Sequence, residues 1–187
     1  MSPDSFPDVL TTSRLVLRKA GRSDVPALLK YQIDNRTHLR RWEPFRDDVF
    51  FTAEHLAGRL AQMEEDMAAG RAVHLILRLP GDEAMVGECN FTSIVRGAFQ
   101  ACVLGYSLDR GFEGGGFMKE ALSVAIETMF SVCKLHRIMA NYHPENLRSG
   151  RLLERLGFEK EGRARAYLKI NGQWADHILT SRINPAD

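Results

Sequence analysis

The stretch from Leu104 to Phe130 combines a short strand pattern, a glycine-rich turn and an amphipathic helix pattern. Because glycine has no Cβ, such a turn lets backbone N–H groups approach a ligand closely. The turn leads into a helix N-terminus, where free N–H groups and the positive end of the helix dipole coincide. It is therefore suited to bind a phosphate or another anion. The four glycines of the turn are Gly111, Gly114, Gly115 and Gly116.

The same glycines could form a plain connection between a strand and a helix, and the turn alone does not separate the two interpretations. Two well-known phosphate loops do not fit. A Walker loop needs Gly-Lys followed by Ser or Thr, whereas Phe117 follows Gly116. A dinucleotide-binding fingerprint needs a third glycine at position 119, where the chain has Lys119.

The elements that would position this turn are predicted from hydrophobic periodicity and from turn residues. Ser23 and Thr52 are expected to cap the first two helices, and Asn171-Gly172 is typical of a two-residue hairpin turn. Residues 1–11 are expected to form a loose N-terminal arm, and residues 36–49 an irregular segment. The predicted strands are 14–19, 74–79, 85–94, 101–108, 137–141, 161–170 and 173–183, and the predicted helices are 24–34, 52–70, 116–132 and 146–156.

The order of these elements indicates one α/β (α+β) domain over residues 1–187. Three consecutive strands joined by short turns should be antiparallel, and the strand–helix–strand unit that follows should be parallel. The result is a mixed sheet with helices on both faces. We expect a crevice beside the glycine turn, where the pairing changes from antiparallel to parallel.

Composition narrows the class of protein. A net charge of +1 gives no support for a nucleic-acid coat or for a membrane-surface protein that acts through bulk charge. Cys89, Cys102 and Cys133 lie in apolar segments without metal or redox spacing, so we expect buried free thiols in a reducing cytosol. No apolar run approaches the ~20 residues of a membrane span, and no signal-peptide pattern is present. The sequence predicts a cytoplasmic protein with no metal site.

Motifs along nearly the whole chain carry a family resemblance. They lie at 10–15, 41–44 (Arg-Trp-Glu-Pro), 95–99, 104–107, 136–142, 148–150 (Arg-Ser-Gly), 156–162 and 176–177 (Asp-His). In these motifs the chain resembles the GNAT superfamily of acetyl-CoA-dependent N-acetyltransferases. More narrowly, it is similar to the bacterial RimJ/RimL-type enzymes, and most to the RimJ branch. The resemblance implies the GNAT fold with a mixed sheet of six or seven strands.

The resemblance also implies a coenzyme site. The coenzyme motif of the superfamily, Gln/Arg-x-x-Gly-x-Gly/Ala, falls on residues 113–118. Gly116 matches it, whereas Glu113 and Met118 depart from it. Because the family uses mainly backbone N–H groups here, Glu113 can point to solvent. The implied contacts of acetyl-CoA are Tyr106, Ser107 and Leu108 on the strand, Glu113, Gly114, Gly115, Gly116, Phe117 and Met118 in the loop, and Asn146 and Ser149 beyond the next strand.

Catalytic roles are implied by the same resemblance. Ser149 is the candidate proton donor or hydrogen-bond partner for the leaving thiolate. Asn141 stands where related enzymes carry a glutamate base, and it cannot take a proton. Glu43, Glu88 and His143 remain alternatives, although each could be an ordinary exposed side chain. An α-amine with a pKa of about 7.7–8.0 is partly neutral near pH 7.4, unlike a lysine at about 10.4, so a missing base favours an α-amine as acceptor.

The resemblance implies that the acceptor is the N-terminal alanine of a ribosomal protein, and that the enzyme is a monomer or homodimer with possible association with the ribosome. Trp42, Glu43 and Tyr167 are expected to bind the acceptor peptide. Two alternatives stay open. One is acetylation of a small-molecule amine, because fold does not fix substrate. The other is a CoA-binding ribosome-assembly or interaction protein that docks through its basic residues, at 36–46 and at Arg163 and Arg165.

Overall fold

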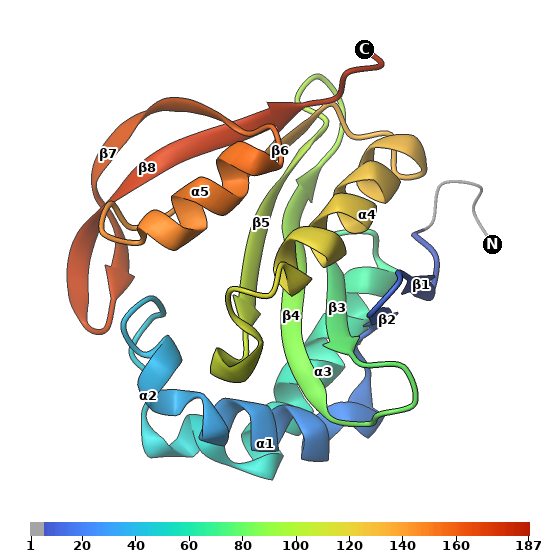
Figure 1. The fold of residues 1–187 in the computed structure, drawn as a ribbon, viewed down its shortest axis with the longest axis vertical. Helices are drawn as coiled ribbons and strands as arrows, with labels where there is room; N and C mark the ends of the chain where they lie inside the picture. Colours follow the sequence, from blue (N-terminus) through green and yellow to red (C-terminus); the bar gives the residue numbers. More distant parts are fainter. Residues whose placement is uncertain (1–5) are drawn as a thin grey trace.

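A computed structural model describes residues 6–187 (Figure 1). Its centre is a sheet of eight strands in the order β1-β2-β3-β4-β5-β6-β8-β7. The strands are β1 Val9–Thr11, β2 Val16–Lys19, β3 Val73–Arg78, β4 Met85–Val95, β5 Ala101–Leu108, β6 Arg137–Met139, β7 Glu159–Ile170 and β8 Gln173–Ile183. The helices are α1 Val25–Asp34, α2 Arg36–Leu39, α3 Ala53–Ala68, α4 Phe117–Ser131 and α5 Leu147–Arg155, with short 3₁₀ turns η1 Arg22–Asp24, η2 Asp48–Phe51 and η3 Arg110–Phe112.

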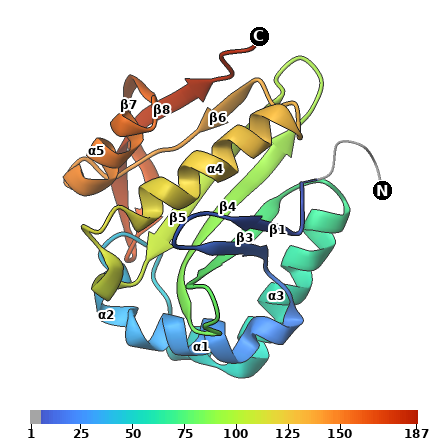
Figure 2. The ribbon, with the colours of Figure 1, turned by 45° about the vertical axis from the view of Figure 1, so that its right-hand side comes forward.

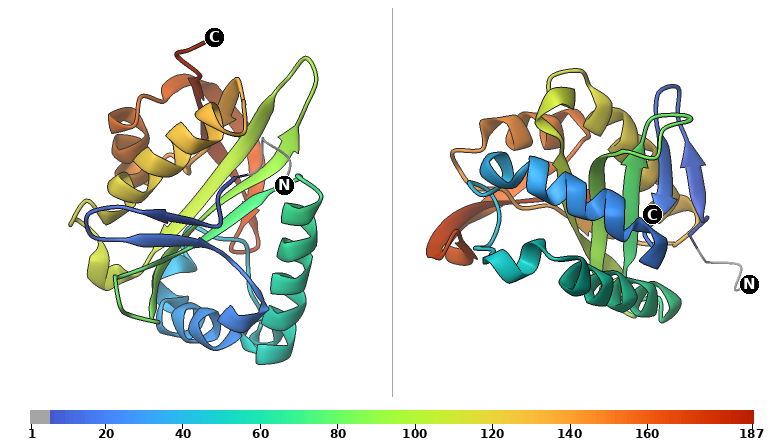
Figure 3. Two further views of the ribbon diagram at one scale, coloured as in Figure 1. Left: turned by 90° about the vertical axis from the view of Figure 1, so that its right-hand side faces the viewer. Right: turned by 90° about the horizontal axis from the view of Figure 1, so that it is seen from below.

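The predicted mixed sheet is confirmed. Neighbouring strands pair antiparallel, except that β5 and β6 pair parallel across the α4 crossover. Two different cores cover the two faces of the sheet, and Figure 3 shows α4 and α3 on opposite sides. Along β3, Leu75 and Leu77 pack into the α4 core, whereas Ile76 between them packs with α1 and α3. This alternation follows from the two-residue period of a strand.

The sheet has more strands than the six or seven expected. Residues 9–11 were predicted to belong to a loose arm, but they form β1 and pair with β2 (Figure 2). Phe6, which is only 5% exposed, anchors this edge in the α4 core. Burial of an apolar side chain favours an ordered segment even where the local pattern is weak. The part of the predicted arm before residue 6 lies outside the described residues.

Most predicted boundaries are confirmed, with two corrections. Ser23 does not cap the first helix. Instead, the carboxylate of Asp24 accepts a hydrogen bond from the Gly21 N–H at 2.8 Å. The segment predicted to be irregular contains α2 and the start of η2. Thr52 caps α3 as predicted, by accepting a bond from the His55 N–H.

Cys89, Cys102 and Cys133 are buried and form no disulfide among residues 6–187, as predicted. Over residues 6–187, the helices are too short or too polar to cross a membrane.

Candidate active site

The cleft follows from how two strands separate. β5 pairs with β6 only through Ala101, Cys102 and Val103. Beyond this point β5 stays with β4 as far as Leu108. The chain after β6 instead follows β8, with a hydrogen bond from the Ala140 N–H to the Thr180 carbonyl at 3.0 Å. As a result, residues 104–108 present one open backbone edge, and Figure 1 shows β5 and β8 diverging there.

The direction of the free N–H groups on this edge can be worked out from the pairing. The Asp109 N–H donates to the Val86 carbonyl at 2.8 Å, so residue 109 points its backbone toward β4. Backbone groups alternate in direction along a strand. The N–H groups of Tyr106 and Leu108 therefore face the open edge. Two donors on one edge can pair with amide carbonyls of an extended ligand or stabilise a developing oxyanion.

The glycine turn has the backbone that the sequence analysis expected. Gly114 and Gly116 have φ values of +78° and +79°, in the left-handed region that favours glycine. Gly116 is the N-cap of α4 and provides no side-chain cap. The first N–H groups of this long helix are thus left to an anion or to water. An anion-binding site at this corner remains a prediction that its geometry supports.

Arg14 holds the glycine turn in place and was missed by sequence reasoning. Its Nη1 donates to the Gly115 carbonyl at 3.0 Å, and its guanidinium lies over the Phe117 ring at 4.2 Å. Arg14 also pairs with Glu120 in the first turn of α4, at 2.7 Å. Hydrogen bonds from Thr12, Arg14 and Ser13 lower the pKa of Glu120 to about 2. No local signal links residues this far apart in the chain.

Glu113 differs from expectation, and the side chain of Met118 is buried. Glu113 does not point to free solvent, because its carboxylate contacts His38 Nε2 at 3.2 Å and forms an ion pair with Arg148. Burial, together with Arg148, lowers the pKa of His38, so this imidazole is neutral near pH 7. Met118 turns its side chain into the α4 core, where it is 6% exposed. Met118 can therefore offer only its backbone to a ligand.

Ser149 and Tyr106 meet across the cleft. The Tyr106 hydroxyl and Ser149 Oγ lie 2.7 Å apart, which joins β5 to α5. Asn146 Oδ1 accepts a bond from the Ser149 N–H at 3.1 Å, which confirms the predicted helix cap and fixes the serine in the first turn. Burial raises the pKa of Tyr106 to about 12, so its phenol is protonated at neutral pH and can donate to Ser149.

Ser107 lies on the opposite face of β5. Its hydroxyl is 2.8 Å from the Tyr31 hydroxyl of α1. Burial and the charge of Glu88 raise the pKa of Tyr31 well above its usual value, so this phenol is also neutral. The side chains of Tyr106 and Ser107 therefore lie on opposite faces of the sheet, the first against α5 and the second against α1.

The predicted acceptor residues are connected by a row of rings. Trp42 lies 5.9 Å from His143, His143 lies 6.2 Å from His177, and Tyr167 lies 5.7 Å from His177, measured between ring centroids. Asn141 Nδ2 donates to the Tyr167 hydroxyl at 3.2 Å. The structure thus brings Asn141, Trp42 and Tyr167 onto one wall. Their roles in catalysis and acceptor binding remain predictions.

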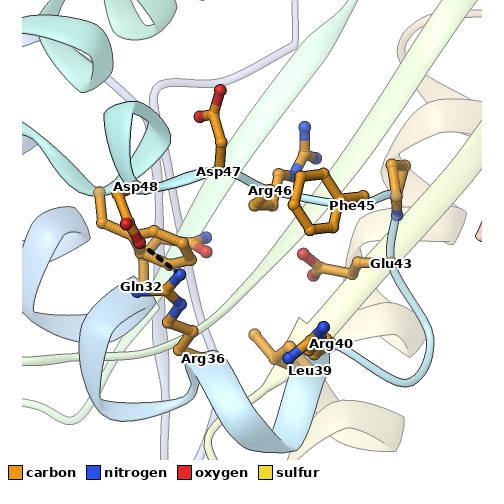
Figure 4. A pocket seen from close by; sticks show the side chains of 11 residues that line it. Gln32, Arg36, Leu39, Arg40, Glu43, Phe45, Arg46, Asp47 and Asp48 are labelled. Carbon is orange, nitrogen blue, oxygen red and sulfur yellow. Dashed lines mark hydrogen bonds and ion pairs between the residues drawn. The ribbon is translucent and has the colours of Figure 1, made fainter. Parts of the chain in front are cut away.

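Glu43 lies in a pocket of about 260 Å³ at the end of this wall, and Figure 4 shows its carboxylate turned into the pocket. The Asn171 N–H donates to the Glu43 carbonyl at 2.9 Å, so the tip of the β7–β8 hairpin fixes this loop. Burial, reinforced by the charge of Glu88, raises the pKa of Glu43 to about 6. This carboxylate is therefore a better proton acceptor than an exposed glutamate.

Comparison with known proteins identifies the family. The acetyltransferase (GNAT) domain model matches residues 14–159. An Escherichia coli protein named [ribosomal protein uS5]-alanine N-acetyltransferase is 46% identical over 176 residues, which cover 94% of this chain and 91% of that protein. The crystal structure of ribosomal-protein-S5-alanine acetyltransferase from Vibrio fischeri is 40% identical, has a TM-score of 0.90 and aligns with 95% of this chain and 97% of its own.

A Mycobacterium smegmatis RimJ structure in complex with CoA-disulfide has a TM-score of 0.91 at 27% identity, over 98% of this chain and 90% of its own. These matches confirm the resemblance to RimJ/RimL-type enzymes that the motifs indicated. The assignment of the open β5 edge, the glycine turn and the Tyr106–Ser149 pair to the coenzyme site remains a prediction. The chain belongs to the GNAT family of acetyltransferases.

Proposed function

We propose that this protein transfers the acetyl group of acetyl-CoA to the α-amino group of the N-terminal alanine of ribosomal protein uS5. The observation that carries the substrate assignment is 46% identity, over 94% of this chain, to the Escherichia coli enzyme of that activity. Such a reaction belongs in the cytoplasm, beside newly made or assembling ribosomes. Direct transfer fits the site because no cysteine is accessible as a nucleophile among residues 6–187.

The residues present fit a coenzyme with a diphosphate and an amide-containing arm. The N–H groups at the start of α4 and in the glycine turn would hold the diphosphate. The N–H groups of Tyr106 and Leu108 would pair with the arm and with the thioester carbonyl. These donors would stabilise the negative charge that develops on the carbonyl oxygen when the amine attacks.

Ser149 would stabilise the leaving sulfur. Its hydroxyl is close to Tyr106, and a hydrogen bond donated by this phenol would raise the acidity of the serine proton. A serine hydroxyl is a weak acid, so hydrogen bonding to the thiolate is its main contribution. Asn141 would position Tyr167 rather than take a proton, because its amide nitrogen donates to that phenol.

An acceptor peptide would lie along the wall formed by Trp42, Tyr167 and Glu43. This wall is connected through ring contacts with His143 and His177. Flat rings supply contact area on which a short, extended peptide can pack. An α-amine is partly neutral at physiological pH, which makes it a better match for this site than a lysine side chain.

The decisive experiment compares protein N-termini by mass spectrometry in cells with and without this protein. We expect the N-terminal alanine of uS5 to be acetylated only when the protein is present. A catalytically impaired Ser149→Ala variant should restore little acetylation, whereas the wild type should restore it fully. Normal acetylation of uS5 without the protein would contradict the proposal. Acetylation by purified protein of a polyamine, but of no alanine-starting peptide, would favour a small-molecule acceptor.

A further inference from the structure

Four charged side chains meet on the α1/α3 side of the sheet, and we call them the acid–base cluster: Glu43, Glu88, Arg46 and Arg59. Glu88 of β4 is only 7% exposed. Its ion pair with Arg59 of α3 has a nitrogen–oxygen distance of 3.4 Å, which is long for such a contact. The guanidiniums of Arg46 and Arg59 lie 4.4 Å and 5.9 Å from the centre of the Phe50 ring.

The cluster has hydrogen-bonding capacity that the chain does not use. Arg46 Nε and Arg59 Nη1 are buried and have no hydrogen-bond partner within residues 6–187. Glu43 is half-buried beside them, and the charges that act on its carboxylate are those of Glu88, Arg46 and Arg59. Buried polar groups are nearly always paired, so idle donors beside carboxylates indicate a ligand that carries both an acceptor and a donor.

The cluster adjoins the reaction centre on the side opposite Ser149. Glu88 is directly across from Ser107 in the β4–β5 pairing, and the two side chains share a face of the sheet. Ser107 bonds to Tyr31, whose phenol is influenced by the charges of both Glu88 and Glu43. The neighbouring residue, Tyr106, turns to Ser149 on the other face. An amine held by the cluster would thus approach β5 from one face, while the leaving sulfur meets Ser149 on the other.

We propose, resting on the function proposed above, that the acid–base cluster binds the free N-terminus of the acceptor peptide. The carboxylates of Glu43 and Glu88 hold the α-ammonium group, and Glu43 takes its proton. Arg46 and Arg59 donate to the first peptide carbonyl. An ammonium followed by a carbonyl offers donors to the carboxylates and an acceptor to the idle arginine donors. A simple alkylamine lacks the acceptor.

The proton balance is simple. One proton passes from the α-ammonium nitrogen to a Glu43 carboxylate oxygen, and the neutral amine uses its lone pair to form the nitrogen–carbon bond. The carbon–sulfur bond breaks with its electron pair on sulfur. The second nitrogen-bound proton, lost as the nitrogen becomes an amide, reaches the thiolate through the Ser149 hydroxyl. Glu43 returns its own proton to water.

The surroundings of Glu43 suit a base near neutral pH. Burial and the like charge of Glu88 on β4 raise its pKa, whereas Arg46 on the same loop and Arg59 on α3 lower it less. Tyr31 on α1 faces the cluster as a neutral phenol. The charged lining of the pocket is completed by Arg36 of α2, Arg40 just after it, Asp47 and Asp48 (Figure 4). A base is most effective when its pKa is near the working pH.

The first test is the pH dependence of kcat/KM with an alanine-starting peptide. For the wild type we expect an acidic limb near pH 6, from Glu43. Glu43→Gln should remove this limb and lower kcat at least 100-fold, while Glu43→Asp should keep the limb at a reduced rate. Glu88→Gln should move the limb to lower pH, because the like charge that raises the Glu43 pKa is gone. Glu65→Gln, at an exposed position of α3, is the control and should match the wild type.

Two results would contradict the proposed binding site for the N-terminus but not the transfer activity. One is a pH profile of Glu43→Gln that keeps the acidic limb of the wild type. The other is a profile of Glu88→Gln whose acidic limb has not moved. Failure of the wild type to acetylate any alanine-starting peptide would instead overturn the proposed function. Thermal unfolding and CoA binding of each variant show whether it is folded. If Glu43→Gln does not fold, the pH profiles of the other two variants decide. The acidic limb should move to lower pH in Glu88→Gln and should persist in Glu43→Asp.

The second test addresses the arginines by calorimetry on the CoA-loaded enzyme. Arg46→Met should weaken binding of an alanine-starting peptide at least tenfold, because the first carbonyl loses a charged donor. Arg71→Met removes an exposed arginine just after α3 and should leave the affinity unchanged. Equal peptide affinity in Arg46→Met and the wild type would overturn the assigned role of Arg46.

Discussion

Tyr106 and Ser149 form a polar contact that links two elements of the fold. The hydroxyls lie 2.7 Å apart, and one belongs to β5 while the other belongs to α5. The Asn146 cap fixes the backbone of Ser149, so the tyrosine is what orients its side chain. At the scale of single residues, the role proposed for Ser149 therefore depends on the pair rather than on the serine alone.

Tyr106→Phe removes one hydroxyl of this pair. We expect kcat to fall about tenfold, equivalent to about 1.4 kcal/mol, with little change in CoA affinity. The measurement is steady-state kinetics together with calorimetry of CoA binding. The double variant with Ser149→Ala should be no worse than Ser149→Ala alone, because the two residues act as a unit. Additive losses would show that Tyr106 acts independently of Ser149.

At the scale of elements, the glycine turn and α4 must keep their mutual geometry for the helix N-terminus to face the cleft. Gly116 has a φ of +79°, and Arg14 clamps the adjacent Gly115 carbonyl. A Cβ at Gly116 would find ordinary contact with Arg14 at 3.7 Å, so space is not the constraint there. The constraint is the left-handed backbone.

Gly116→Ala should lower the free energy of unfolding by about 1–2 kcal/mol, which is the cost of a left-handed L-residue. It should also weaken CoA binding, because the turn would relax away from its binding geometry. Denaturant unfolding and calorimetry measure the two effects. Gly162→Ala in β7 is the matched control, since that glycine has open space and no positive φ. Equal behaviour of the two variants would contradict the assigned role of the turn.

Another element-scale feature is the carboxylate that joins β2, β3 and the start of α1. Asp24 is 1% exposed and forms ion pairs with Arg18 and Arg78, the latter at 2.8 Å. It also accepts the Gly21 N–H. Removal of one member of a buried ionic group leaves the other charges without compensation.

Asp24→Asn should therefore reduce the free energy of unfolding by about 3–5 kcal/mol. Asp34→Asn provides a control, because Asp34 forms an exposed i,i+4 pair with Lys30 on α1. That change should cost no more than about 0.5 kcal/mol. Chemical denaturation of both variants tests the contrast, and similar stabilities would contradict it.

At the scale of the whole molecule, Glu120 ties the N-terminal strands to the central helix. It accepts hydrogen bonds from Thr12, Ser13 and Arg14, across more than 100 positions of the chain. These bonds lower its pKa to about 2. The tether joins the β1–β2 edge of the sheet to the helix whose N-terminus faces the cleft.

A lowered carboxyl pKa contributes stability above the unfolded value of about 4.3 and loses it as pH falls. Wild-type stability should therefore decrease between about pH 5 and pH 2, where Glu120 is protonated. Glu120→Gln should be less stable at pH 7 and should show a flatter decrease over that range. Thermal unfolding from pH 7 to pH 2 measures this, with Glu65→Gln as the control. Parallel curves for Glu120→Gln and the wild type would contradict the tether.

Much of the fold could be predicted from the sequence because its signals are local. The observed bounds of β5, Ala101–Leu108, and of β8, Gln173–Ile183, match the predicted ones. The Asn171-Gly172 turn has positive φ at both residues, as its chemistry requires. β1 was missed because three residues carry too little periodicity, and its place depends on pairing with β2.

The sequence by itself determined the family, the main helices and strands, the glycine turn and the cap at Asn146. Each of these features is signalled by residues that lie close together in the sequence. Only the tertiary structure decided that Arg14 clamps the turn, that Glu113 pairs with Arg148, and that Glu43 is near Glu88. Such contacts join residues tens of positions apart, and their partners are set by how the packed cores place whole elements, not by any local preference of the chain.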